Sequence, residues 1–355
     1  AAAPSPRTAA TRSRSLAKSI EISAAVLDEA ASRPLPPHLA TMRPRNKQYL
    51  MFYTAETRAW AEQLAAIDKD KYVRARESKM ERFPDGTLNA QVFDIEHARD
   101  RHVLYLASFS SYERLYEDYA SLVVLCQSFP QSVTIVLPFF PSGTMERVGG
   151  DAGVIATANV DSWMLTTLPC PGNMNRFVIF DLHTLQNKFY FGNTSMADLT
   201  SAVPAIPTAV AGFGGEWRVA FPDDGAAKRF GAAFADNELV VCGKVRDGDR
   251  RVVRIKDGDA RDRDVLIVDD LVQSGGTLIQ CMKVLREAGA RRVVAWVTHA
   301  VLPNDAHKRF LADGDGAGFD HFYTTDSRPH TAARLAAHPD RFTIVPLAPL
   351  MHLVL

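Results

Sequence analysis

The stretch from Val265 to Thr277 constrains the fold more than any other part of the chain. It reads V-L-I-V-D-D-L-V-Q-S-G-G-T, an apolar run that ends in two adjacent carboxylates and continues into small hydroxyl and glycine residues. Val265–Val268 has the length and β-branching of a buried parallel strand, and residues 278–289 repeat apolar side chains at helical spacing. The sequence therefore predicts a strand, a tight loop and a helix in direct succession.

Such a junction is suited to binding a phosphate group. The two glycines within Ser274–Thr277 permit backbone angles that turn several N–H groups inward, and the flanking hydroxyls add donors. The start of the following helix adds partial positive charge at the same place. Asp269 and Asp270 suit a ribose diol or the water shell of Mg²⁺, because direct contact with phosphate would repel them.

The composition is that of a globular protein with room for two domains. The chain has 355 residues, of which 46% are hydrophobic and 23% charged. Lys plus Arg equals Asp plus Glu at 41 each, so no overall field favours binding to nucleic acid or an anionic membrane, and neither partner is expected. The 4 cysteines form no C-x-x-C pair, which argues against a zinc site or disulfide scaffold and indicates a reducing compartment.

The first residues differ from the rest of the chain. Residues 1–19 contain no acid, many small residues, and basic residues at Arg7, Arg12, Arg14 and Lys18. This is the composition of an organellar transit peptide, which predicts a plastid or mitochondrial location; a tail on a cytoplasmic protein is the alternative. Residues 33–44 are proline-rich, so residues 1–46 are interpreted as a transit-like or disordered segment and linker.

From residue 47 onward, short apolar runs alternate with helical patterns. This alternation is typical of crossover units on a parallel sheet, and it occurs in two series. Ligands of such sheets bind at the carboxyl ends of the strands. The predicted strands are residues 49–53, 103–107, 132–138 and 177–181 in the first series, and 218–221, 239–244, 265–270 and 293–298 in the second.

At this point the sequence resembles a ribose-phosphate diphosphokinase, also called phosphoribosyl pyrophosphate synthetase. The V-D-D-L-V-Q-S-G-G-T loop is similar to the product-binding signature of type I phosphoribosyltransferases. The combination of this loop with the P-F-F-P segment at residues 138–141 is most similar to the divergent plant-type branch of the family, class II. The four further motifs of the resemblance are F-P-D-G at 83–86, P-F-F-P-S-G-T-M-E-R at 138–147, D-L-H-T-L-Q at 181–186 and T-H-A-V-L-P at 298–303.

The resemblance implies an α/β fold of two tandem type I phosphoribosyltransferase-like domains, each a mainly parallel sheet flanked by helices. The first is expected over residues 47–202, with residues 336–355 returning to it, and the second over residues 203–335. The implied reaction transfers the diphosphoryl group of MgATP to the C1 hydroxyl of ribose 5-phosphate, giving phosphoribosyl pyrophosphate and AMP for nucleotide biosynthesis. Mg²⁺ is the implied cofactor, and a homo-oligomer is the implied assembly.

The resemblance also assigns roles to residues. Lys244 and Arg246 match the mobile cations that close over the phosphates and act in catalysis. His183 and Asp223 match residues associated with Mg²⁺. The implied ATP contacts are Phe83, Asp85, Arg147 and His183. The implied ribose 5-phosphate contacts are Asp269, Asp270, Gln273, Ser274, Gly275, Gly276 and Thr277.

The chain also departs from the better-known members. Thr87 stands where they have Glu, and residues 144–146 (T-M-E) replace Arg-Gln-Asp, so Arg147 is the candidate to supply the missing charge. Gln273 stands where many members have Asp, which removes a negative charge beside the phosphate. These departures leave open strict use of ATP and favour a second hypothesis, a non-catalytic regulatory subunit of such a synthetase. A nucleobase phosphoribosyltransferase is a weaker third hypothesis, because it would not use residues 138–147.

Structural interpretations of the same residues remain open. Phe83 could be a core residue, and His183 could be an ordinary histidine at the end of a strand. Lys244 and Arg246 could be surface charges, because residues 246–256 are rich in both signs.

Overall fold

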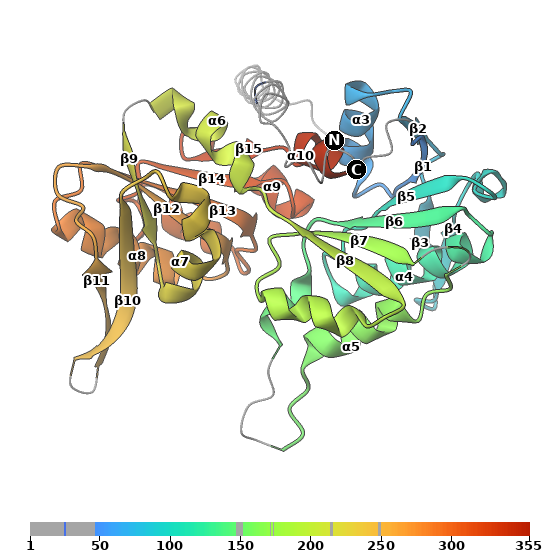
Figure 1. Ribbon diagram of the computed structural model, residues 1–355, viewed down its shortest axis with the longest axis horizontal. Helices are drawn as coiled ribbons and strands as arrows, with labels where there is room; N and C mark the ends of the chain where they lie inside the picture. Colours follow the sequence, from blue (N-terminus) through green and yellow to red (C-terminus); the bar gives the residue numbers. More distant parts are fainter. Residues whose placement is uncertain are drawn as a thin grey trace. The chain divides into compact units, whose positions relative to one another are not determined.

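The computed structural model of the chain describes residue 25 and residues 47–146, 152–170, 172, 174–213, 216–247 and 250–355, with the backbone alone described for 213, 244–247 and 250–252. These residues form an N-terminal unit (47–201 and 347–355) and a C-terminal unit (202–346) (Figure 1). The predicted segment 1–46, apart from residue 25, and Arg147 lie outside the described residues. No helix within the described ranges is long and apolar enough to cross a bilayer.

The N-terminal unit is built on a parallel sheet. Its strands, in their order across the sheet, are β2 (Tyr72–Arg74), β1 (Tyr49–Phe52), β5 (His102–Leu106), β6 (Ser132–Leu137), β7 (Asn175–Phe180) and β8 (Ser195–Thr200). All five pairings are parallel. Val103, Leu104 and Tyr105 are successive and all buried, as expected of a parallel strand that is covered on both faces. The helices are α3 (Arg58–Ile67), α4 (Tyr112–Gln127), α5 (Thr157–Thr166) and α10 (Ala348–Val354), with 3-10 helices η1 (Ile95–His97), η2 (Pro141–Thr144) and η3 (Leu185–Phe191).

The end of the chain belongs to the N-terminal unit. Helix α10 packs against α3, and His352 of α10 is bonded to the Tyr72 hydroxyl at 3.1 Å. Arg176 of β7 donates to the carbonyl of Val354 at 3.0 Å. The terminal helix therefore closes on the same sheet at which the described chain begins.

A two-stranded antiparallel hairpin extends the N-terminal unit. It consists of β3 (Lys79–Arg82) and β4 (Leu88–Gln91), with a turn over residues 83–87. Arg82 ties the hairpin to α4, because its Nη2 donates to Oε1 of the buried Glu117 at 2.9 Å. Its Nη1 donates to the carbonyl of Gly86 at 3.1 Å, so the same guanidinium also holds the turn.

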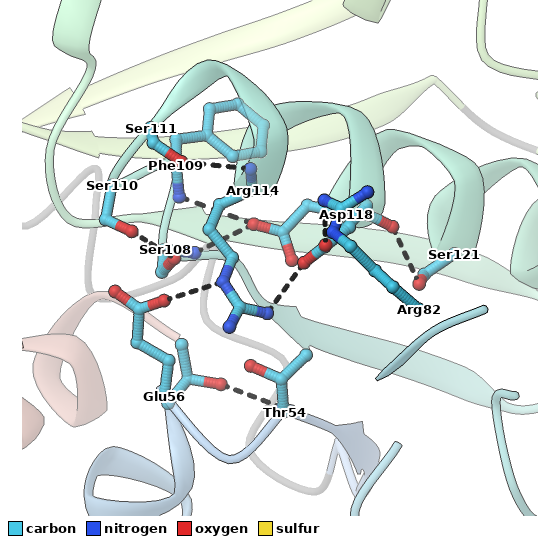
Figure 2. A network of polar contacts seen from close by, with 12 residues as sticks. Thr54, Glu56, Arg82, Ser108, Phe109, Ser110, Ser111, Arg114, Asp118 and Ser121 are labelled. Carbon is cyan, nitrogen blue, oxygen red and sulfur yellow. Dashed lines mark hydrogen bonds and ion pairs between the residues drawn. The ribbon is translucent and has the colours of Figure 1, made fainter. Parts of the chain in front are cut away.

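The connection from β5 to α4 is organised by a buried carboxylate (Figure 2). Asp118 accepts from the Tyr105 hydroxyl at 2.7 Å and from the amides of Ser108 and Phe109 at 3.0 and 3.3 Å. Phe109 has φ of 43°, an unusual conformation for a residue with a side chain. Burial raises the pKa of Asp118 to about 7, although its hydrogen bonds act in the opposite direction.

The C-terminal unit is built on a larger sheet. Its strands, in order, are β11 (Arg250–Asp257), β10 (Leu239–Asp247), β9 (Trp217–Phe221), β12 (Asp264–Val272), β13 (Arg292–Ala300), β14 (His321–Thr325) and β15 (Phe342–Val345). Only β11 pairs antiparallel among these described strands. The helices are α6 (Ile206–Val210), α7 (Asp224–Phe230), α8 (Gly276–Glu287) and α9 (Pro329–Leu335), with 3-10 helices η4 (Val203–Ala205), η5 (Ala211–Phe213), η6 (Gly231–Phe234) and η7 (Ala306–Phe310).

The two sheets confirm the predicted fold class, an α/β protein with parallel sheets flanked by helices. One boundary differs from the expectation. Residues 336–346 stay with the C-terminal unit, because β15 pairs with β14 in parallel and Phe342 packs on Phe322. The chain passes to the N-terminal unit only at Leu347.

Candidate active site

The predicted phosphate loop, residues 274–277, lies at the junction of β12 and α8 and includes the first residues of the helix. Gly275 has φ of +81° and caps α8, and the amide of Ile279 donates to its carbonyl at 2.9 Å. The first amides of a helix have no partner within the helix, so those of residues 275–278 are available to a ligand. Ser274 is exposed and Thr277 is half-buried, so their hydroxyls can be reached from solvent.

The loop is backed by carboxylates. Asp269 Oδ1 accepts from the amide of Asp270 at 2.9 Å, and both residues lie near the carboxyl end of β12. Asp223 follows the neighbouring strand β9 and caps α7, where it accepts from the amide of Ala226 at 2.9 Å. Loss of solvent and the charge of Asp270, with a smaller contribution from Asp223, hold the pKa of Asp269 well above its usual value. The three carboxylates are therefore close enough to repel one another.

Sequence reasoning missed one charged neighbour of this group, Arg229. Its Nη1 lies 3.4 Å from Asp270 Oδ2, and both side chains are almost buried. In the sequence, Lys228-Arg229 is typical of cations in the last turn of a helix, which hides the contact. The usable signal was its position on α7, the helix that starts directly after Asp223.

Lys244 and Arg246 lie at the same end of the sheet. Strand β10 pairs with β9 from Leu239 to Val241, which lies opposite Phe221. Beyond Val241 it pairs with β11 alone, as a two-stranded ribbon (Figure 1). Lys244 and Arg246 are on this ribbon, beyond the carboxyl end of β9. The strand continues past the expected end at Lys244 because β11 supplies hydrogen-bonding partners as far as Asp247.

The remaining predicted site residues belong to the N-terminal unit. Phe83 is 51% exposed in the turn between β3 and β4, so the interpretation as a core residue is wrong. Asp85 accepts from the amide of Thr87 at 2.9 Å and from its hydroxyl. These bonds, the hydroxyl first, lower the pKa of Asp85.

His183 follows β7 and is exposed. The preceding Asp181 is buried, has φ of 38°, and accepts from the Ser201 hydroxyl at 2.6 Å, which fixes the start of the motif. The two predicted motifs of this region meet here. A Cβ on Gly143 of η2 would lie 3.8 Å from His183 Cβ, and Asn187 of η3 donates to the Gly143 carbonyl at 3.0 Å.

The predicted Mg²⁺ pair does not lie in one unit, since His183 is in the N-terminal unit and Asp223 in the C-terminal unit. Within the described ranges, no three His, Cys, Asp or Glu side chains form a group that would hold a metal ion on their own. The carboxylates of the C-terminal unit are hard oxygen ligands, which suit Mg²⁺ completed by water and substrate oxygens.

Comparisons with known proteins agree with this geometry. Residues 226–314 match the phosphoribosyl transferase domain family. A chloroplastic ribose-phosphate pyrophosphokinase 3 from Oryza sativa subsp. japonica is 43% identical over 292 residues, 81% of this chain and 71% of the relative. A mitochondrial ribose-phosphate pyrophosphokinase 3 from Spinacia oleracea is 40% identical over 309 residues, 85% and 75% of the two chains.

The crystal structure of phosphoribosylpyrophosphate synthetase from Mycobacterium smegmatis is similar in fold. It has a TM-score of 0.68 and 24% identity, and the match covers 86% of this chain and 97% of that one. The described units therefore define a phosphoribosyltransferase-type α/β protein. More specifically, the chain belongs to the ribose-phosphate pyrophosphokinase family, which confirms the resemblance found in its motifs, including its plant-type character.

Proposed function

We propose that the chain is a ribose-phosphate diphosphokinase, which transfers the diphosphoryl group of MgATP to the C1 hydroxyl of ribose 5-phosphate and gives phosphoribosyl pyrophosphate and AMP. The observation that carries the proposal is the loop Ser274–Thr277 at the start of α8, directly after Asp269 and Asp270, in a chain of this family. A sugar phosphate needs N–H donors for its phosphate and acceptors for its hydroxyls, and the two are adjacent here.

In this proposal the amides and hydroxyls of residues 274–277 bind the 5-phosphate, together with the neutral Gln273. Asp269 and Asp270 accept from the ribose hydroxyls. The ion pair with Arg229 orients the Asp270 carboxylate. The sugar would then present its C1 hydroxyl at the carboxyl end of the sheet.

The transfer itself is an in-line attack by the C1 hydroxyl on the β-phosphorus of ATP, with AMP as the leaving group. Its main demand is to position and neutralise a crowded polyphosphate. Lys244 and Arg246 are proposed to supply this positive charge from the β10–β11 ribbon. Arg can hold two phosphoryl oxygens at once, and Lys adds a compact charge.

The nucleotide is assigned to Phe83, Asp85, Arg147 and His183. The exposed Phe83 ring is available to stack on adenine. Thr87 keeps the Asp85 carboxylate ionised, which suits an acceptor for the adenine amino group. Arg147 and His183 would face the phosphates.

Mg²⁺ fits the oxygen ligands present, and Asp223 and His183 are the residues proposed to associate with it. When bound, it supplies positive charge to the polyphosphate. Its charge would also counter the burial and the repulsion from Asp270 that together raise the pKa of Asp269. Asp223 contributes independently by capping α7, which fixes its position at the end of β9.

A homo-oligomer and an organellar location complete the proposal. Trp163 of α5 and Phe189 of η3 are 66% and 74% exposed on elements that pack together, which supports association with further copies of the chain. Light scattering of the full chain tests this. The location is supported by the acid-free composition of residues 1–19 and by the chloroplastic and mitochondrial relatives, and is tested with a fluorescent fusion in plant cells.

The activity is tested by measuring AMP release from ATP. We expect release to depend on both ribose 5-phosphate and Mg²⁺, and phosphoribosyl pyrophosphate to appear in equal amount. Absence of turnover at millimolar substrates would contradict the proposal. If the chain were inactive but changed the turnover of an active synthetase on mixing, the regulatory-subunit hypothesis raised by Thr87 and residues 144–146 would replace it.

A further inference from the structure

We propose that Arg309 and Asp315 form a positioning clamp beneath the phosphate loop. The clamp holds the peptide between Ser274 and Gly275 so that the Gly275 N–H faces the bound phosphate group. The inference rests on the proposed function, because it concerns the same loop. Neither residue is among the predicted contacts of ribose 5-phosphate.

The contacts of Arg309 use all three guanidinium nitrogens. Nη1 donates to the carbonyl of Ser274 at 2.5 Å. Nε and Nη2 donate to the two carboxylate oxygens of Asp315 at 2.9 and 2.5 Å. A two-pronged pair of this kind fixes the plane of the guanidinium, so the remaining N–H group has a set direction.

That direction matters because of peptide geometry. In a trans peptide the C=O and the following N–H point to opposite sides. Arg309 binds the Ser274 carbonyl, so the Gly275 N–H points away from Arg309. The Gly275 carbonyl is already bonded to Ile279, and Gly275 has φ of +81°, so the next peptide is fixed as well.

The clamp is itself held in place. The amide of Gly316 donates to the Arg309 carbonyl at 2.8 Å, and a Cβ on Gly314 would lie only 2.0 Å from that oxygen. The chain can therefore wrap around Arg309 only with glycine at 314. The neighbouring Phe310 ring packs against Gly275, where a Cβ would lie 2.6 Å from the ring. The loop and its support thus form one packed unit.

A simple surface ion pair is the competing interpretation. The side chains of Arg309 and Asp315 are 37% and 44% exposed, and pairs of this kind contribute little to stability. The distinguishing contact is the bond to the Ser274 carbonyl inside the loop. Loss of the clamp should therefore weaken phosphate binding far more than it lowers the melting temperature.

The test compares Arg309→Ala with Arg286→Ala. Arg286 is a matched control, because it is 31% exposed, pairs with Asp320 at 2.5 Å and donates to backbone carbonyls, among them that of Gly318 at 2.9 Å. Arg286 lies in the last turn of α8, whereas the phosphate loop includes the start of that helix. Calorimetry with ribose 5-phosphate should show binding weakened about 10-fold, about 1.4 kcal/mol, in Arg309→Ala and unchanged within about twofold in Arg286→Ala.

Two further variants sharpen the result. Asp315→Asn should weaken binding in the same direction by a smaller factor, and Arg309→Lys should not restore it, because Lys cannot make the two-pronged pair. Hydrogen exchange of residues 275–278 should speed up in Arg309→Ala without ligand. An Arg309→Ala protein that binds like the wild type, or an equal loss in Arg286→Ala, would overturn the clamp.

The experiment also separates the clamp from the proposed function. If the wild-type chain bound no ribose 5-phosphate, the proposed function would fail, and faster exchange of residues 275–278 in Arg309→Ala would still support the clamp. If the wild type bound the sugar phosphate and the Arg309→Ala exchange and affinity were both unchanged, the clamp alone would fail.

Discussion

The phosphate loop of the C-terminal unit and the 83–87 turn of the N-terminal unit are supported in a similar way. In each, an arginine outside the segment donates to a backbone carbonyl within it and pairs with a carboxylate. Arg309 bonds to Ser274 and Asp315, and Arg82 bonds to Gly86 and Glu117. The groups proposed to bind ligands differ, since the loop offers backbone amides and the turn offers the side chains of residues 83 and 85.

The two supports also differ in their response to protons. Arg309 lowers the pKa of the exposed Asp315, so this pair stays ionised at mildly acidic pH. In the N-terminal unit, the buried Asp118 beside Glu117 has a pKa of about 7. The loop is thus supported by an ion pair that stays charged at mildly acidic pH, whereas the helix that anchors the turn contains an acid with a pKa near neutrality.

The largest expected effect distinguishes the proposed catalytic residues from the two arginine supports. Lys244→Ala should lower kcat/KM roughly 1000-fold, about 4 kcal/mol, because it removes a positive charge proposed to act on the transferred group. The melting temperature should hardly change. Steady-state kinetics and thermal melting check this against Lys308→Ala, which removes an exposed lysine paired only locally with Asp305. A collapse in stability with unchanged turnover per folded molecule would contradict the role of Lys244.

The pH dependence of stability tests the difference in proton binding between the two supports. Asp118 has a raised pKa in the folded state, so the folded chain binds more protons than the unfolded chain between about pH 4 and 7. The free energy of unfolding should therefore fall as pH rises through this window, by up to about 4 kcal/mol for three pKa units, and level off above it. Urea unfolding at a series of pH values measures the slope.

Asp118→Asn is the control for that slope. The amide cannot titrate, so the slope between pH 5 and 7 should flatten in this variant. Hydrogen exchange, corrected for intrinsic rates, should assign the effect to peptides of the N-terminal unit around Ser108 and Phe109, whose amides bond to Asp118. A slope that persists in the variant, or that arises in the C-terminal unit, would assign the titration to another group.

The difference between the segments also explains what the sequence could predict. The phosphate loop follows from local rules, because a β-branched run, two glycines and a helical repeat are contiguous. Its strand was expected at residues 265–270 and occurs at Asp264–Val272, and its helix was expected at 278–289 and occurs at Gly276–Glu287. The crossover rhythm likewise predicted four strands in each unit, β1, β5, β6 and β7 in the first and β9, β10, β12 and β13 in the second.

Contacts between distant residues escaped prediction. Arg229 and Arg309 reach the site from helices that fold back onto it, and nothing in their immediate sequence distinguishes them from surface cations. The strands of the 79–91 hairpin read K-M-E-R and L-N-A-Q, and only the second, a run of four residues, alternates apolar and polar side chains. Strands β2, β8, β11, β14 and β15 were also missed, and of these β14 and β15 are almost entirely buried.

Gly275→Ala tests whether the loop depends on its backbone. At φ of +81° a side chain is strained, and the new Cβ would lie 2.6 Å from the Phe310 ring. We expect ribose 5-phosphate to bind roughly 30-fold more weakly, about 2 kcal/mol, because the amides shift. Calorimetry and thermal melting provide the measurements.

Gly289→Ala is the matched control for that strain. Gly289 has φ of +94° just after the other end of α8, and its nearest neighbour is Arg261 Cγ at 3.5 Å. The free energy of unfolding of this variant should fall on the order of 1 kcal/mol, with unchanged ligand affinity. Equal loss of affinity in both glycine variants would mean that binding reports general destabilisation.

The smallest effect is expected at the turn. Arg82→Ala removes the bond to the Gly86 carbonyl, but Glu117 keeps its ion pair with Arg114 at 2.6 Å, so no buried charge is left without a partner. KM for ATP should rise about fivefold, about 1 kcal/mol, with KM for ribose 5-phosphate unchanged. Lys79→Ala, on the same strand and paired with Glu81, should change neither constant. If Arg82→Ala affected the sugar phosphate as strongly as ATP, the turn and the loop would not be independent supports, since a frame that serves only the nucleotide cannot alter both.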